Sequence, residues 1–318
     1  MEDKKGSVKQ KGNFWNHDRK DALKGYLLIF PSILLLGIFT IYPIFYLLDS
    51  SLRDGSLLSK KREFVGLENF ITLFKSVDFH TTLKNTFIYS VGLVAILMVL
   101  ATLLAVWVNG KAQKRLNSVT LAAVFTPHII SLVSVSTVFL WIMDPQIGAI
   151  NYVLRTLGLK PFPFLASSKT ALASLVGMMV WKSLGYYSLL ILAALQGVPK
   201  DIYEAAEIDD TPKIRTFFRI TLPMISPTLF FTTIVATISS FQVFETVNLM
   251  TQGGPVNSTN TLVYQIYSDA FKYLKLGPAT AEAVVLLTMV GILTLPVFLL
   301  PGQEGTLSIK RRLRREKT

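Results

Sequence analysis

The 318-residue sequence contains no cysteine, which excludes disulfides, thiolate zinc sites and lipidated cysteines. Its three histidines, His17, His80 and His128, fall in three separate segments, so no metal-binding cluster is visible. The phosphate-binding pattern GxxxxGKS/T, the nucleophile pattern GxSxG and the zinc pattern HExxH are also missing. We therefore expect no enzymatic active site and no cofactor bound by this chain.

Charge is scarce as well. Charged residues make up 16% of the chain, against about 25% in a typical soluble domain. Six apolar runs are each long enough to cross a bilayer as a helix. They cover residues 25–48, 85–108, 119–142, 171–195, 224–249 and 281–301. The first is too long for a signal peptide and no cleavage site follows it. The sequence predicts an all-α, polytopic membrane protein with six transmembrane helices.

The basic residues are unevenly placed around these runs. If the N-terminus lies inside, most of the 32 Lys and Arg fall in short inside segments. Because cytoplasmic loops are enriched in these residues, both termini and the segment 203–223 are predicted to be cytoplasmic. The same bias, with anionic lipid head groups, explains the net charge of +12 without a nucleic-acid partner.

The runs also divide the chain into segments. Residues 1–24 form a basic cytoplasmic segment, and 25–84 form the first span with an outside loop. Residues 85–301 form a core of five helices that includes a loop at 196–223, and 302–318 form a basic cytoplasmic tail.

The segment YEAAEIDDTPKIRTFFRITLP (203–223) is charged and amphipathic although it separates two apolar runs. Helical periodicity divides it into two short helices. The stripe of the first helix is Val198, Ile202, Ala205 and Asp209, and that of the second is Ile214, Phe217, Phe218 and Leu222. Thr211 is the predicted N-cap and Pro212 the first residue of the second helix, which Pro223 ends. This hairpin could dock into a groove of a partner or lie on the bilayer surface.

The segment resembles the EAA loop in the membrane subunits of binding-protein-dependent ABC importers, with the pattern E-A-A-x-x-D-G-A followed by I-x-L-P. The matching residues are Glu204, Ala205, Ala206, Asp209, Ile220, Leu222 and Pro223. FVGLENF (64–70), WKSLGYY (181–187), LQGVPKDIYEA (195–205) and TQGGPVNSTNTLVYQIY (251–267) resemble its carbohydrate branch, the maltose-type first permease subunits. The family's glycine is Asp210 here. If that position needs a positive φ, aspartate can adopt it at some cost.

The resemblance implies a type I ABC importer permease in a bacterial or archaeal cytoplasmic membrane. The implied partners are a second homologous permease, two ATPase subunits that bind ATP and Mg, and an extracytoplasmic solute-binding protein. The implied solute is a sugar or oligosaccharide, with a glycerol 3-phosphate-like compound or a uronide as the alternative. The implied ATPase-coupling residues are Glu204, Ala205, Ala206, Asp209, Asp210, Arg215, Leu222 and Pro223.

Polar side chains inside apolar runs indicate a cavity or a helix contact, because lipid offers them no partner. The candidate substrate pathway is Lys182, Tyr186, Tyr187, Ser239, Ser240, Gln242 and Glu245. By resemblance, Tyr186 aligns with a sugar-contacting position, as do Ser239 and Ser240 less closely. Serine and threonine also hold helices together. Lys182 could instead reach the membrane surface or pair with Glu245, and we interpret His128 as a packing residue.

A self-sufficient secondary transporter is the main alternative. It would place ionisable residues in several spans and show internal repeats. The sequence shows one glutamate of this kind, Glu245, and no clear repeat. A membrane-anchored structural protein would leave the hairpin unexplained. Co-purification distinguishes these three hypotheses, because only an importer subunit should be isolated together with an ATPase and a second permease.

The predicted orientation can be tested with single cysteines, because the chain has none of its own. Cysteines at Ser168 and Asn257 should react with an impermeant thiol reagent in intact cells, whereas one at Lys200 should be shielded. Labelling at Lys200 from outside would reverse the orientation.

Overall fold

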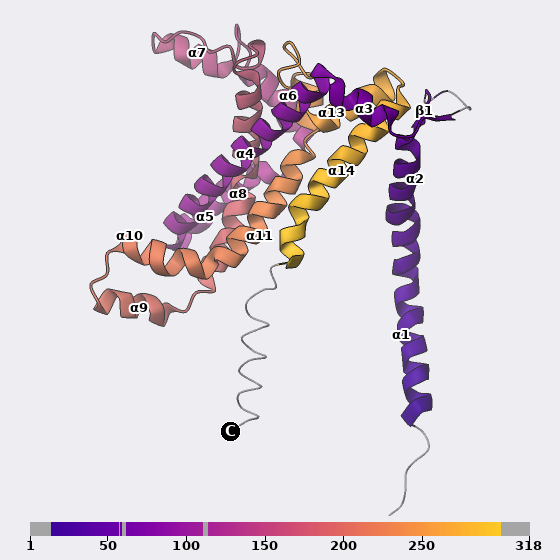
Figure 1. Ribbon diagram of the computed structural model, residues 1–318. Coiled ribbons are helices and arrows are strands. Elements are labelled where there is room, and N and C mark those ends of the chain that lie inside the picture. Colours follow the sequence, from indigo (N-terminus) through magenta and orange to yellow (C-terminus); the bar gives the residue numbers. More distant parts are fainter. Residues whose placement is uncertain (1–13, 57, 59–61, 111–113, 300–318) are drawn as a thin grey trace, which may run out of the picture.

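The computed structural model describes residues 14–56, 58, 62–110 and 114–299, and nearly all of its regular structure is helical (Figure 1). The predicted tail 302–318 and most of the segment 1–24 lie outside the described residues. Two short strands, β1 (Arg53–Asp54) and β2 (Glu63–Phe64), pair antiparallel after the first span. The fold class predicted from the sequence is confirmed.

The elements follow one another from end to end of the described chain. The N-terminal half contains α1 (Phe14–Leu36), the π turn η1 (Gly37–Ile41), α2 (Tyr42–Ser51), α3 (Glu68–Lys75), α4 (Val77–Asn109), α5 (Lys114–Ile129), α6 (Leu132–Ile142) and α7 (Ala149–Thr156). The C-terminal half contains η2 (Phe164–Ala166), α8 (Ala171–Gln196), α9 (Lys200–Ile208), α10 (Lys213–Thr216), the π turn η3 (Phe217–Thr221), α11 (Leu222–Phe241), α12 (Glu245–Met250), α13 (Leu262–Tyr267), η4 (Ser268–Lys272) and α14 (Leu276–Leu299).

Five helical segments are long and apolar enough to cross a membrane: Lys24–Ser51, Val77–Asn109, Ala171–Gln196, Lys213–Phe241 and Leu276–Pro296. The third predicted span is different, because α5 and α6 meet at an angle of 98°. Pro127 lies inside the last turn of α5 and Ser131 has an extended backbone. Since proline removes a helical N–H, the chain bends sharply here instead of running straight from 119 to 142.

The fifth predicted span, 224–249, begins and ends elsewhere. Pro223 was expected to end the hairpin helix, but the helix runs on from Lys213 to Phe241. In the π turn η3 the N–H of Leu222 donates to the carbonyl of Phe217, and this wider turn accommodates the proline that follows. At the other end α11 stops at Phe241, and Glu245 begins the separate helix α12.

The core lies where α4 and α8 pack together, with α5 and α11 against α8. Large side chains such as Tyr89, Leu175 and Ile191 are fully buried there. The first span, α1 to α2, stands apart from this core, and its α2 part packs against α14 (Figure 1). Its apolar side chains are therefore exposed.

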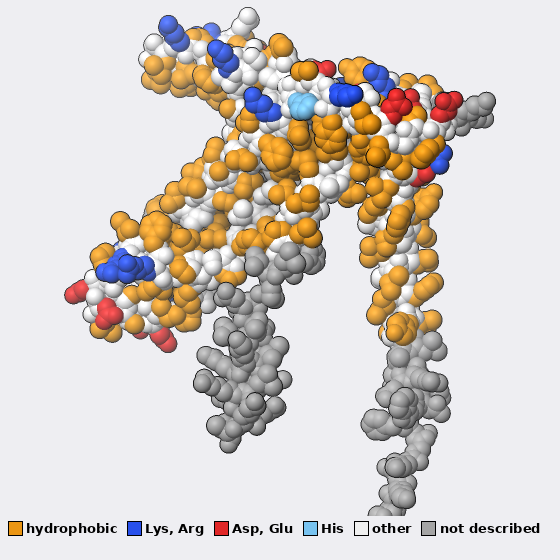
Figure 2. All heavy atoms as spheres, in the orientation of Figure 1, with side chains coloured by type: hydrophobic (Ala, Val, Ile, Leu, Met, Phe, Trp, Pro, Cys, Tyr) orange, Lys and Arg blue, Asp and Glu red, His pale blue; other side chains and the backbone are white. Residues whose placement is uncertain are grey.

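Charged side chains gather at the two ends of the molecule, and an apolar surface covers the spans between them (Figure 2). One end carries α9 and α10, and the other carries α3, α13 and β1 (Figure 1). This arrangement suits a polytopic membrane protein, because lipid contacts the apolar band and water the ends.

Gly185 on α8 allows the close approach of α5. A Cβ at this position would clash with the carbonyl oxygen of Val124, which is part of the backbone and cannot move away as a side chain could. We expect Gly185→Ala to destabilise the protein by about 1–3 kcal/mol, measured as a lower melting temperature in detergent. Gly177→Ala on the same helix has open space around it and is the matched control. Equal melting temperatures for the two variants would contradict this packing.

Candidate functional site

The hairpin between α8 and α11 is closed by a turn in which Asp210 has a φ of +45°. The N–H of Asp210 donates to the carbonyl of Glu207 (3.1 Å), and that of Thr211 donates to the carbonyl of Ala206 (2.9 Å). These two bonds form a Schellman motif, which normally uses glycine at the positive φ. The expected left-handed aspartate is therefore present, and the turn is intact.

The start of the second hairpin helix is one residue later than predicted. Pro212, not Thr211, is the N-cap, and its carbonyl accepts the first helical hydrogen bond, from the N–H of Thr216 (2.9 Å). Pro212 itself has an extended backbone, with ψ at 139°, so the helix begins at Lys213. The predicted apolar stripe of this helix is divided. Ile214 and Phe218 are exposed, whereas Phe217 and Leu222 are half-buried.

An open groove of about 380 Å³ runs along the hairpin. It is lined by Asp201, Ile202, Ala205, Ala206, Asp209, Thr211 and Ile220. The hydroxyl of Thr221 donates to that of Tyr203 (3.2 Å), and this bond fixes α9 on η3. Because alanines form part of its wall, the groove is open to a side chain of another protein.

The predicted coupling residues thus have different positions. Ala205, Ala206 and Asp209 line the groove, and Asp210 makes the turn. Glu204 and Arg215 are exposed on α9 and α10. Leu222 and Pro223 belong to the first turn of α11, outside the groove lining.

A cavity of about 130 Å³ lies between α4, α6, α8 and the junction of α11 with α12. Its lining includes the predicted pathway residues Tyr187, Ser239, Ser240, Gln242 and Glu245. It also includes Tyr89, Ser183 and Thr246, which the sequence analysis missed. Tyr89 and Ser183 are polar residues inside apolar runs, so the same criterion could have found them. The cavity therefore has several hydroxyl groups and two tyrosines on its wall.

The break between α11 and α12 determines the positions of two predicted pathway residues. Gln242 and Glu245 were predicted inside a span, but they stand on either side of the break and are exposed. Glu245 is therefore not an intramembrane glutamate buried in a helix. That description applies to Glu282 on α14, which is 2% exposed and which the sequence analysis did not single out.

Lys182 and Tyr186 do not line the cavity. The ammonium group of Lys182 donates to the carbonyls of Pro127 (3.2 Å), His128 (3.1 Å) and Ile130 (2.7 Å). These carbonyls lie where α5 ends at the 98° bend, and the end of a helix leaves such groups without partners. A cation is also favourable at a helix C-terminus. Within the described residues, no salt bridge joins Lys182 to Glu245.

Tyr186 faces the same bend from α8. Its ring stacks on that of His128, with centroids 4.6 Å apart and an angle of 10° between the planes. The structure therefore places both His128 and Tyr186 in a packing contact. Tyr187, the next residue, is the tyrosine of α8 that lines the cavity.

Residues 80–300 match the family of binding-protein-dependent transport system inner membrane components. The chain belongs to this family. The resemblance seen in the sequence is thereby confirmed, and the protein is a multi-pass permease of the ABC importer type.

Similar proteins and structures agree with this assignment. The sn-glycerol-3-phosphate permease of Agrobacterium fabrum is 34% identical over 274 residues, 85% of this chain and 91% of the relative. The sulfoquinovosyl glycerol permease of the same organism is 33% identical over 275 residues, 86% and 88% of the two chains. A chain in the crystal structure of a bacterial alginate ABC transporter, in complex with a periplasmic protein carrying an alginate pentasaccharide, has a TM-score of 0.79. It is 25% identical, covering 89% of this chain and 95% of that one.

We expect Lys182→Met to lower the stability of the protein by an amount on the order of 3 kcal/mol, because three carbonyls in a buried or partly buried setting lose their donor. Uptake should fall for neutral and anionic solutes alike, since the lysine holds a bend and does not face the cavity. Melting temperature and initial uptake rates measure the two effects. Loss of uptake for anionic solutes alone, with unchanged stability, would show that Lys182 reads solute charge.

Proposed function

We propose that this chain and a second, homologous permease form the translocation pathway of an ATP-driven importer for a sugar or oligosaccharide. A solute-binding protein delivers the solute at the end that carries α3 and α13. Two ATPase subunits bind ATP and Mg and attach at the end that carries α9 and α10. In this proposal the chain itself catalyses no reaction, and both of its termini are cytoplasmic.

The observation that carries the proposal is the continuity of the hairpin with the cavity wall. A single helical segment runs from Lys213 in the hairpin to Phe241, next to Ser239 and Ser240 of the cavity. Its 29 residues span about 40 Å at 1.5 Å per residue. A displacement of the hairpin is therefore transmitted along the helix to the polar end of α11.

The groove supports the position of the ATPase. Its lining contains alanine and isoleucine side chains together with two acids, and Glu204 is exposed on the same helix. A protruding side chain of an ATPase fits this shape, and a basic one complements the charge. When the two ATPase subunits close on ATP, the hairpin moves with them, and α11 changes the access to the cavity. Hydrolysis of ATP then resets the arrangement.

The chemistry of the cavity favours a neutral sugar among the possible solutes. Hydroxyl groups of Tyr89, Ser183 and Ser239 can bind sugar hydroxyls, and Tyr187 offers an aromatic face to a pyranose ring. Glu245 is the one charged residue in the described lining, which contains no Lys or Arg. A phosphate ester or uronide would need a cation, which in that case the second permease must supply.

Glu204→Ala tests the coupling role of the hairpin. On α9 the carboxylate is exposed and Lys200, one turn earlier, offers a pairing worth only a few tenths of a kcal/mol. Folding should therefore be unaffected, while a charge-assisted contact of about 1.5–3 kcal/mol with the ATPase is lost. We expect normal membrane insertion, at least tenfold weaker ATPase association and reduced solute-stimulated hydrolysis of ATP.

Lys200→Ala is the matched control on the same helix and should have a mild effect. Ala205→Trp should reproduce the defect by filling the groove. Full retention of the ATPase and normal uptake by Glu204→Ala would favour a hairpin that lies on the bilayer surface instead.

A further inference from the structure

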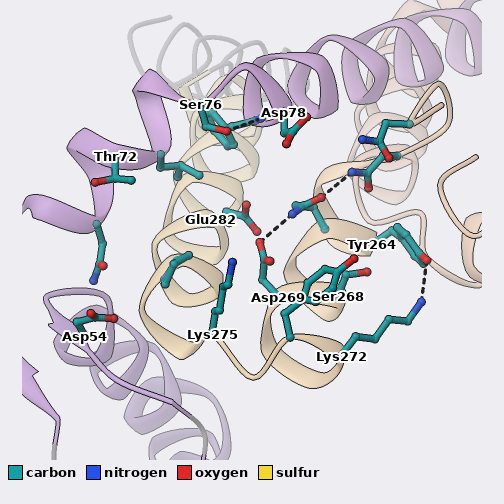
Figure 3. A pocket seen from close by; sticks show the side chains of 18 of the residues that line it. Asp54, Thr72, Ser76, Asp78, Tyr264, Ser268, Asp269, Lys272, Lys275 and Glu282 are labelled. Atoms are coloured by element: carbon teal, nitrogen blue, oxygen red, sulfur yellow. Dashed lines mark hydrogen bonds between the residues drawn. The ribbon is translucent and has the colours of Figure 1, made fainter.

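A second and larger cavity, of about 700 Å³, opens at the end of the molecule opposite the hairpin (Figure 3). It lies between α3, the start of α4, α13 with η4, and the start of α14. Its charged lining residues are the acids Asp54, Glu68, Asp78, Asp269 and Glu282 and the lysines Lys272 and Lys275. Acids therefore outnumber bases here, although the chain as a whole carries a net charge of +12.

The floor of this cavity is a pair of buried carboxyl groups, Asp269 from η4 and Glu282 from α14. They are 8% and 2% exposed, and they point toward each other (Figure 3). The side-chain amide of Gln265 donates to Asp269 (2.8 Å). By contrast, the Oε2 atom of Glu282 is buried and receives no hydrogen bond from the residues that the structure describes. Two adjacent carboxylates out of water repel each other, so the pair requires a proton or a cation.

The two lysines of the cavity do not meet this requirement. The ammonium group of Lys272 donates to the hydroxyl of Tyr264 (2.8 Å) and lies 4.8 Å from the centre of its ring. That of Lys275 lies 5.9 Å from the ring centre of Tyr273. Within the described part of the chain, neither lysine forms a salt bridge with Asp269 or Glu282. A cation that neutralises the pair therefore has to come from outside these residues.

We propose that this cavity binds a basic side chain, preferably an arginine, carried by a loop of the solute-binding protein. A guanidinium group matches two carboxylates with paired hydrogen bonds. The exposed acids Asp54, Glu68 and Asp78 line the way to the floor and attract a positive side chain. The inference rests on the proposed function, because that function supplies a solute-binding protein at this end.

Two properties of the cavity favour a side chain over a bound metal ion. Its volume far exceeds that of a single ion and can accept a long side chain with part of its loop. In addition, the described residues contain no group of three or more His, Asp or Glu side chains placed to hold a metal.

The charge preference of the cavity can be measured without knowing the partner. Because the native chain has no cysteine, a single introduced thiol serves as the probe. Thr72→Cys places a thiol on the cavity wall, and Tyr152→Cys on the exposed helix α7 is the matched control outside it. For each thiol, the rate with a cationic methanethiosulfonate reagent is divided by the rate with an anionic one. This ratio should be about tenfold higher at the cavity thiol than at the control thiol. Adding Asp269→Asn and Glu282→Gln should reduce this preference. Equal reagent ratios at both thiols would overturn the proposal.

The occupant is identified by competition at the same thiol. Methylguanidinium and the purified solute-binding protein should each slow the cationic reagent, whereas Ca²⁺ should not. Protection by Ca²⁺ in place of methylguanidinium would identify a metal site and overturn the proposal. If the ratio of cationic to anionic rates at the cavity thiol changes with pH but with none of the three competitors, the carboxyl groups share a proton, which also overturns the proposal.

A binding measurement on the assembled importer completes the test. Glu282→Gln keeps the shape of the side chain and should weaken the association of the solute-binding protein about tenfold, with unchanged melting temperature. If ATP-driven uptake is normal but Glu282→Gln leaves that association unchanged, the inference fails and the proposed function stands. If the wild-type complex shows no ATP-driven uptake, the proposed function fails, and the reagent ratios at the cavity still report its charge.

Discussion

The need to satisfy backbone polar groups in the absence of water governs how this chain crosses the membrane. Pro43 and Pro223 each follow a π turn, so the helix continues past a residue that has no N–H to donate. Between α5 and α6 the helix does break, and Lys182 supplies the donors for three carbonyls left at the bend. One buried cation thus makes a 98° change of direction possible inside the apolar part of the molecule.

That bend and the break after Phe241 both contribute to the wall of the small cavity. The bend brings Leu132 of α6 to the cavity, and the break turns Gln242 and Glu245 out of helix α11. Interrupted helices are a general way of lining a solute path with polar groups in membrane proteins.

The two ends of the permease differ in the kind of contact that they offer. The hairpin presents an open groove lined partly by alanines, and its second helix belongs to the long helical segment Lys213–Phe241. The opposite end presents a larger acidic cavity, and a carboxyl oxygen on its floor has no hydrogen-bond partner within the described part of the chain. The groove suits a partner that stays bound while it moves, and the acidic cavity suits a partner that binds through charge and then dissociates.

The sequence alone determined the features that depend on local composition and spacing. Apolar runs of sufficient length predicted the spans, helical periodicity predicted the hairpin, and aspartate was judged able to adopt the positive φ that Asp210 has. Only the tertiary structure decided which polar residues meet. Lys182 was assigned to the solute path, but contacts with residues more than 50 positions earlier hold it at the bend. Glu282 was overlooked inside an apolar run, because its partner Asp269 comes from another element. Pairings of this kind depend on how helices pack, and the periodicity along one segment cannot predict them.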